Sequence, residues 1–257
     1  MLAREDRRLV CPRAHSFDLA RSGYINLLQP QDKRSKQPGD TTDAVAGRRR
    51  LHDRGVTAPL LAAIADLSAP GSSDIVLDAG CGDGFYLGTL AQQFGCEGHG
   101  VDISVPAIDA AARRYPACQW IVANADRFVP FGDKSFSVLM SITARMNPAE
   151  FHRVLRPGGR LLVAIPAPDD LIELRGTGRD RVARTLESFD LYFTLTAQRR
   201  VTTTADLDAA TIQDVLHAIY RPLHASPTEA KQVTLSLDLL LLHRRELPPP
   251  SPESQMG

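Results

Sequence analysis

The sequence lacks the features of a membrane or secreted protein. It contains no run of 18 apolar residues and no apolar signal-type segment near its amino terminus. Its four cysteines are scattered without the even spacing of a disulfide framework, which favours a reducing compartment. Net charge is also absent, because 30 Lys and Arg balance 30 Asp and Glu, so no field of the whole protein favours nucleic acid. We therefore expect a cytoplasmic protein with no membrane partner.

The balanced charge is unevenly distributed along the chain. Residues 1–55 hold 12 Lys and Arg against 7 Asp and Glu, including the runs Lys33-Arg34-Ser35-Lys36 and Arg48-Arg49-Arg50. Such runs are usually solvated surface, but they are also what a phosphate backbone would attract. Both interpretations stay open from composition.

A strand, a glycine turn and a helix follow one another from residue 75. Ile75–Leu77 is a short apolar run that suits a buried parallel strand, and Asp78 ends it. Gly80, Gly82 and Gly84 then alternate, which permits a tight turn and a close approach of the backbone to a ligand. Apolar residues return at helical spacing after this turn. The pattern predicts a nucleotide-type site at the carboxyl end of a strand.

The spacing of these glycines distinguishes between ligands. A dinucleotide fingerprint reads G-x-G-x-x-G and places a pyrophosphate at the helix start, whereas this chain reads G-x-G-x-G. Asp78 and Asp83 put carboxylates beside the turn, which would repel a pyrophosphate and suit a ligand that carries an ammonium group and a ribose. A chance glycine turn in another α/β protein is the alternative.

Strands and helices alternate through the rest of the chain, which predicts an α/β fold with a mostly parallel sheet and helices on both faces. We expect helical segments near residues 44–53, 59–67, 85–94, 105–115, 150–155 and 204–218. Seven strands are expected near residues 75–77, 98–102, 119–123, 138–142, 160–165, 191–202 and 233–243. The proline-rich segment 247–257 is predicted to be a disordered tail.

Three further positions complete the expected ligand site. Asp102 ends the second strand, 24 residues after Asp78, where a carboxylate can bind both ribose hydroxyls. Ile103 follows it and is expected to contact the same ligand. Asp126 lies just beyond the third strand, where it would either accept the adenine amino group or cap a turn. Residues 143–148 should face the acceptor of the reaction.

The glycine turn and the amino-terminal region carry a family resemblance. Asp78-Ala-Gly-Cys-Gly-Asp-Gly84 resembles motif I of class I S-adenosylmethionine-dependent methyltransferases. Upstream stand Cys11-Pro-x-x-His15-x-Phe-Asp18, Gly23-Tyr-x-Asn-Leu-Leu28, Gly39-Asp40 and Arg48-Arg49-x-x-x-Asp53-x-Gly55. In this order they resemble the 23S ribosomal RNA (guanine-N1)-methyltransferases, one branch of which confers macrolide resistance. The likeness covers about residues 4–245.

The resemblance implies both the cofactor and the substrate. The cofactor would be S-adenosylmethionine, and the substrate a guanine in a hairpin or single-stranded loop of 23S rRNA near the peptide exit tunnel. Thr57 stands where the family has an aromatic residue that contacts the cofactor, so we include it in the site. Arg145 and Asp170 are further departures from the family pattern, and they affect the acceptor side.

The resemblance also implies a small amino-terminal zinc module that helps to engage RNA. The family's ligands are a C-x-x-C pair followed by Cys and His, and this chain has only the last two, Cys11 and His15. Because structural zinc needs four ligands, zinc is expected only if an upstream Cys pair exists. Without zinc, Cys11 and His15 are two structural residues. We expect a truncated zinc-ribbon-like module at 1–28, a basic linker and helix at 29–58, and the methyltransferase domain at 59–246.

The catalytic group and the aromatic contacts are less defined. No carboxylate lies in residues 143–148, so no proton acceptor is assigned. Phe85, Tyr86 and Phe131 could stack on a base splayed out of its loop, or belong to the core. Two other functions stay open: a small-molecule methyltransferase on the same fold, and a cofactor-binding protein that has lost RNA methylation. A homodimer is also left open.

Overall fold

The computed structural model describes residues 3–5, 7–13, 15–29, 31, 38–218 and 231–247. The basic run at 33–36 and residues 248–257 of the expected tail lie outside the described residues. Within the described part of the chain, no helix is long and apolar enough to cross a membrane.

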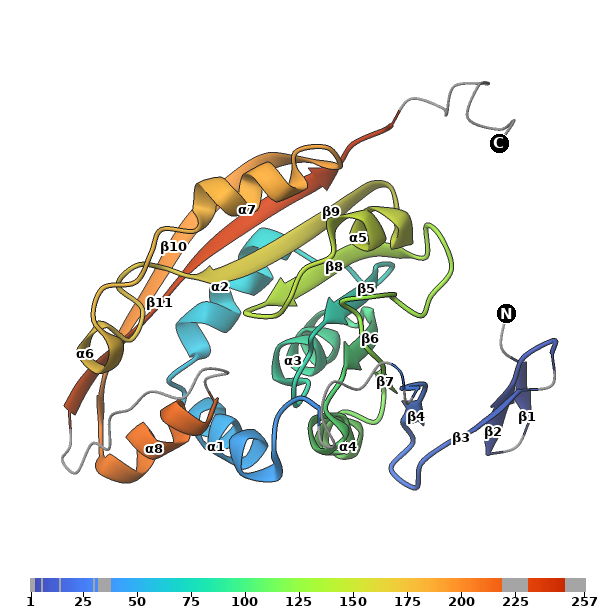
Figure 1. The fold of residues 1–257 in the computed structure, drawn as a ribbon, viewed down its shortest axis with the longest axis horizontal. Coiled ribbons are helices and arrows are strands. Elements are labelled where there is room, and N and C mark those ends of the chain that lie inside the picture. The colour runs from blue at the N-terminus through green and yellow to red at the C-terminus, as the bar shows by residue number, and fades with distance from the viewer. Residues whose placement is uncertain are drawn as a thin grey trace.

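An eight-stranded sheet forms the centre of the molecule (Figure 1). Its strands run in the order β10-β11-β9-β8-β5-β6-β7-β4, and every neighbouring pair from β9 to β4 is parallel, while β11 is antiparallel to both neighbours. The bounds are β4 Ile25–Asn26, β5 Ile75–Ala79, β6 Glu97–Asp102, β7 Gln119–Val122, β8 Phe136–Ile142, β9 Leu155–Pro166, β10 Phe193–Leu207 and β11 Lys231–Arg244. The seven expected strands are all present, and β4 adds an eighth.

Helices cover both faces of this sheet, which confirms the expected fold class. One face packs against α2 (Ala58–Ser68), α3 (Phe85–Phe94) and α4 (Val105–Arg114), whose buried residues share one apolar cluster with alternate strand positions. The other face packs against α5 (Pro148–Val154) and α7 (Val182–Phe189) through a second cluster. Strands buried on both faces explain the continuous apolar runs of the sequence.

A long hairpin arm extends the sheet at one edge. β10 and β11 pair along their whole length, and α8 (Ala209–Ala218) follows β10 and packs against α1 (Thr42–Asp53). The strand β10 continues through residues 204–207, which we expected to be helical, because their partners on β11 extend the ladder that far. A short helix, α6 (Ile172–Arg175), lies beside β11. The carboxyl-terminal part of the chain therefore packs against α1, which lies near the amino terminus.

The amino-terminal module is a separate small sheet (Figure 1). Strands β1 (Ala3–Glu5), β2 (Arg8–Val10) and β3 (Ser16–Asp18) pair antiparallel in that order. The chain then crosses to the large sheet, where β4 pairs with β7 and the Ser22 hydroxyl donates to Asp109 on α4 at 2.6 Å. The structure thus differs from the expected division at residue 28, since residues 25–26 belong to the large sheet.

Candidate functional site

The glycine turn between β5 and α3 lies at the carboxyl edge of the parallel strands. Gly80 and Cys81 both donate their backbone N–H to the Val101 carbonyl of β6, at 2.8 and 3.1 Å. The turn is therefore hydrogen-bonded to the neighbouring strand β6, whose last residue is Asp102. The structure brings the two predicted halves of the site together.

The three glycines of the turn all have positive φ, but they serve different neighbours. A Cβ on Gly80 would lie 2.3 Å from the Ala144 Cβ, and one on Gly84 would lie 2.4 Å from Trp120. These two glycines are required by packing inside the protein. A Cβ on Gly82 would instead come within 2.9 Å of the Arg48 guanidinium. Gly82 is thus the glycine that faces a charged side chain.

Both carboxylate oxygens of Asp102 accept hydrogen bonds from the backbone around the glycine turn. One accepts the N–H of Gly82 at 2.9 Å, and the other accepts the N–H of Ser104 at 2.8 Å. Burial raises the pKa of Asp102, and these two bonds act against that rise. Each carboxylate oxygen has more than one lone pair, so Asp102 keeps capacity for ribose hydroxyls. Ile103 lies half-buried between Asp102 and Ser104.

Asp78 is the most deeply buried carboxylate of the site. It is 1% exposed, and among the described residues its Oδ1 has no hydrogen-bond partner. Burial, followed by the negative charge of Asp102, raises the pKa of Asp78 to about 8. A buried polar atom without a partner is costly, and a cationic ligand would stabilise it.

His52 of α1 lies beside the glycine turn. The His52 ring stacks on Phe85 with centroids 3.9 Å apart, and its Nδ1 lies 2.6 Å from the Thr57 hydroxyl. Its Nε2 is buried 3.9 Å from Asp83 Oδ1 and makes no hydrogen bond to any described residue. Burial, and then the charge of Arg48, lowers the pKa of His52 to about 3, so the ring is neutral at pH 7. Thr57 is therefore connected to the site through its hydrogen bond with His52.

Arg48 is the cation of this site. Its Nη1 donates to Asp40 Oδ2 at 2.6 Å and lies beside Gly82, on the same face of α1 as His52, four residues later. Asp40 is held in turn, because its carbonyl accepts the Ser104 hydroxyl at 2.8 Å. The sequence placed Arg48 in a basic run and in the family pattern of the amino-terminal region, but not in the cofactor site. Its four-residue spacing from His52 is the signal that could have placed it there.

The other arginines of that run also have partners inside the protein. Arg50 donates to Asp214 of α8 with Nε at 2.8 Å, and Arg49 lies 3.8 Å from Asp53. The close approach of α1 and α8 occurs at Gly47, where a Cβ would meet the Asp214 backbone at 3.2 Å. Arg48 and Arg50 thus hold α1 in place, which speaks against a purely phosphate-binding role for the run.

The segment after β8, which we expected to face the acceptor, contacts the loop after β7. Arg145 Nε lies 3.5 Å from Asp126 Oδ2, and Asn147 donates its amide to the Asp126 carbonyl at 2.9 Å. The turn at this position is capped by Asn124, whose Oδ1 accepts the Asp126 N–H at 3.2 Å, rather than by Asp126 itself. Asp126 keeps the adenine role as a prediction, with Arg145 as its neighbour.

Asp170, the third departure from the family pattern, has a structural role. Its Oδ1 accepts the Ser236 N–H at 2.9 Å, and its Oδ2 accepts the Arg175 Nη2 at 2.7 Å. Asp170, in the segment after β9, thereby joins α6 to β11.

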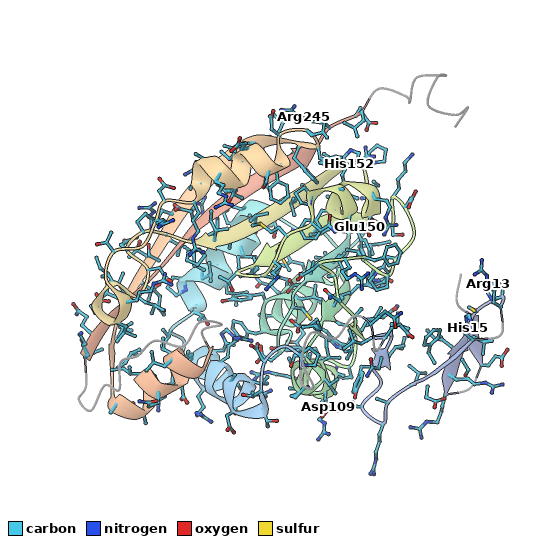
Figure 2. All side chains as sticks on the ribbon, viewed as in Figure 1. Arg13, His15, Asp109, Glu150, His152 and Arg245 are labelled. Carbon is cyan, nitrogen blue, oxygen red and sulfur yellow. The ribbon has the colours of Figure 1, made fainter. Side chains whose placement is uncertain are left out.

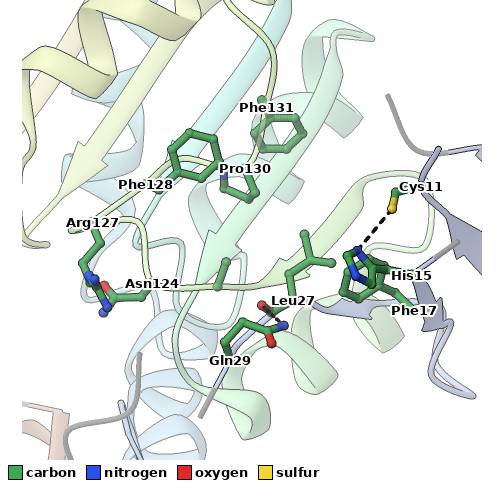
Figure 3. A pocket seen from close by; sticks show the side chains of 11 residues that line it. Cys11, His15, Phe17, Leu27, Gln29, Asn124, Arg127, Phe128, Pro130 and Phe131 are labelled. Carbon is green, nitrogen blue, oxygen red and sulfur yellow. Dashed lines mark hydrogen bonds between the residues drawn. The ribbon is translucent and has the colours of Figure 1, made fainter. Parts of the chain in front are cut away.

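Cys11 and His15 lie together (Figure 3), and Figure 2 shows the place of His15 in the amino-terminal module. The Cys11 Sγ is 3.4 Å from the His15 Nδ1. In the described part of the chain, no third Cys, His, Asp or Glu joins such a group. Two donors do not satisfy the tetrahedral set that structural zinc requires, so these residues as they stand do not fit the metal.

Comparison with known proteins agrees with this architecture. A methyltransferase domain profile matches residues 76–159, and a profile described as "RlmA, N-terminal" matches residues 1–36. The chain is 36% identical to the 23S rRNA (guanine(748)-N(1))-methyltransferase of Streptomyces fradiae over 89% of this chain and 84% of the relative. The chain belongs to the 23S rRNA (guanine-N1)-methyltransferase family.

Solved structures support the fold of this family member. A geranyl diphosphate methyltransferase in complex with S-adenosylmethionine aligns with a TM-score of 0.51 at 19% identity, over 82% of this chain and 93% of that one. The YcgJ protein from Bacillus subtilis aligns with a TM-score of 0.51 at 18% identity, over 73% and 98%. At these identities the likeness shows the fold alone.

The residues of the turn fit the cofactor of this family. S-adenosylmethionine presents an ammonium, a sulfonium, a carboxylate and a ribose. The site offers the Asp78 oxygen without a described partner, the Asp83 and Asp102 carboxylates, and the Arg48 guanidinium. Its charges therefore complement those of the cofactor.

The expected aromatic contacts are distributed between the site and the core. Phe85 and Tyr86 surround His52 beside the turn, with Tyr86 edge-on at 5.5 Å. Phe131 packs edge-on against the buried Phe136 at 4.8 Å. Stacking of any of the three on a base stays a prediction.

Proposed function

We propose that this protein transfers the methyl group of S-adenosylmethionine to N1 of a guanine in 23S rRNA, at the position that corresponds to guanine 748. The observation that carries the proposal is the similarity to the Streptomyces fradiae enzyme over nearly the whole chain, including the amino-terminal module. A methyltransferase core alone would not account for that module. A protein that acts on ribosomal RNA would work in the cytoplasm, and both this location and macrolide resistance are part of the proposal.

The cofactor would be held by the residues of the glycine turn and by α1. Asp102 would accept the ribose hydroxyls, because both its oxygens are already fixed by backbone N–H groups. Asp78 and Asp83 would face the positive charges. Arg48 would pair with the carboxylate, since its guanidinium lies beside Gly82. Ile103, Asp126 and Thr57 complete the proposed site.

The bound cofactor supplies an activated methyl group on a good leaving group, so the protein contributes mainly by positioning. Guanine N1 carries a proton at neutral pH, and that proton must leave as the new bond forms. The segment after β8 contacts the turn directly, because Ala144 packs on Gly80. This segment holds the acceptor base in place without supplying a carboxylate.

The test is methyl transfer to 23S rRNA fragments. The purified protein and S-adenosylmethionine are incubated with an unmodified hairpin fragment, and the product nucleotide is mapped by mass spectrometry. We expect 1-methylguanine at the position that corresponds to 748. When that guanine is replaced by 1-methylinosine, whose N1 is already methylated, we expect no methyl transfer to this position. Cofactor binding without RNA-dependent turnover would contradict the proposal, as would transfer to small molecules alone.

A further inference from the structure

A cavity lies between the amino-terminal module and the core, at some distance along the sheet edge from the glycine turn (Figure 3). Its volume is about 480 Å³, within the range of about 300–1,000 Å³ that ligand pockets occupy. Three separate segments form its walls: the module, the chain after β4, and the loop after β7. Its lining is Cys11, His15, Phe17, Leu27, Gln29, Ala123, Asn124, Arg127, Phe128, Pro130 and Phe131.

One wall of the cavity carries a solvent-exposed aromatic ring, Phe128. Phe128 is 56% exposed, and the guanidinium carbon of Arg153 lies 4.8 Å from its ring centre. Arg153 is itself fixed, because it donates to Glu150 and to the carbonyls of Val129 and Phe131 at 2.7–2.9 Å. An exposed aromatic ring on a rigid support is a stacking platform prepared before its ligand arrives.

The charge of the lining indicates the kind of ligand. None of the described residues that line the cavity is acidic, and Arg127 places a positive charge there, with its Nη1 3.4 Å from the Gln31 carbonyl. Asn124 and Gln29 add side-chain amides, which can pair with the edges of bases. Aromatic, amide and cationic groups without carboxylates complement a nucleotide, with its flat base and anionic phosphate.

The position of the cavity relates it to the reaction. Ala123 and Asn124 follow β7 at the same carboxyl edge at which Asp78 lies near the end of β5 and Asp102 ends β6. A nucleotide bound in this cavity would therefore lie at the same sheet edge as a target base presented to the cofactor site. We propose that the cavity binds an unpaired base of the substrate RNA, other than the target guanine, stacked on Phe128 with its phosphate toward Arg127. This inference rests on the proposed function.

The experiment is a double-mutant cycle between the full-length protein and the RNA. Each loop nucleotide of the 23S rRNA hairpin fragment is replaced in turn by an abasic nucleotide, and affinity is measured for the wild-type protein and for Phe128→Ala. We expect one position at which base removal weakens binding by about 5- to 100-fold, the range for stacking of one base. Phe128→Ala should cause a similar loss, and the two losses should not add.

Three controls make the result specific. Phe128→Trp should restore the affinity, since it keeps an aromatic face. Leu191→Ala removes an apolar side chain that is 64% exposed elsewhere and should change nothing. Arg127→Gln should flatten the slope of log affinity against log salt by about 0.7, the value for one phosphate contact on a single strand. Affinity for S-adenosylmethionine should be unchanged in Phe128→Ala, which shows that the variant is folded.

The outcomes separate this inference from the proposed function. Additive losses, or no position that couples to Phe128, would overturn the base-binding cavity even if the protein methylates the RNA. Coupling without any methyl transfer would support the cavity while the proposed function fails. If Phe128→Ala binds the bare RNA normally but binds the assembled ribosomal subunit weakly, the cavity takes a protein segment and the inference is wrong.

Discussion

The glycine turn and the cavity beside the amino-terminal module lie at one edge of the sheet, and they are built in opposite ways. The turn is a continuous segment whose backbone is tied to β6, with three carboxylates around it, two of them fully buried. The cavity is assembled from three distant segments, has no acidic residue in its described lining, and holds an exposed ring. The difference indicates that the turn suits a small cationic ligand, whereas the cavity suits a polyanion.

The largest effect is expected from two glycines, one in the glycine turn and one in the chain between β3 and β4. Gly84 and Gly23 both have positive φ, at 74° and 99°. At Gly84 a Cβ would clash with Trp120 at 2.4 Å, whereas at Gly23 no atom lies within 4 Å. Gly84→Ala should therefore lower the free energy of unfolding by about 2–5 kcal/mol, and Gly23→Ala by about 1–2 kcal/mol. Urea denaturation of both variants measures the difference, and equal losses would contradict the packed turn.

The next effect compares two arginines of the same helix. Arg48→Met should weaken S-adenosylmethionine binding by about 10- to 100-fold, since a charge-assisted bond to the carboxylate is lost. It should not affect decarboxylated S-adenosylmethionine, which lacks that group. Arg50→Met is the matched control, because Arg50 binds Asp214 of α8; it should lower stability and leave both affinities unchanged. Calorimetric titration distinguishes them, and an unchanged affinity in Arg48→Met would remove Arg48 from the site.

The smallest effect concerns pH and depends on Asp78. Because its folded pKa of about 8 lies above the ordinary value of 3.8, the folded state binds more protons, and stability falls as pH rises between these values. His52 acts in the opposite direction between pH 3 and 6.5, since its folded pKa is lowered to about 3. The decline should therefore appear between about pH 6.5 and 8, at about 1.4 kcal/mol per pH unit at most.

Asp78→Asn should remove most of this decline, because it keeps the shape of the side chain without the ionisation. Asp133→Asn, which changes an exposed carboxylate in the loop beside the cavity, should keep the wild-type slope. Stability measured by urea denaturation across this range checks both. A wild-type slope in Asp78→Asn would show that Asp78 is not the group responsible.

Local sequence determined the cofactor side of this protein. Alternating glycines permit the positive φ that the turn adopts, an apolar run of that length forms a buried strand, and the spacing from Asp78 to Asp102 is that of neighbouring parallel strands. The seven strands followed from the apolar patterns, whereas the family followed from the resemblance of the glycine turn and, above all, of the amino-terminal region. The strand β4 was missed, because two residues are too short to show a period.

Tertiary structure alone decided what surrounds that turn. Arg48 and His52 reach it because α8, 164 residues beyond Arg50, packs on α1, and no local period records a contact of that separation. Asp126 pairs with Arg145 because two loops meet there. The cavity likewise exists only where three segments converge. Backbone preferences are local and can be read from a sequence, whereas burial and charge pairing depend on which distant segments pack together.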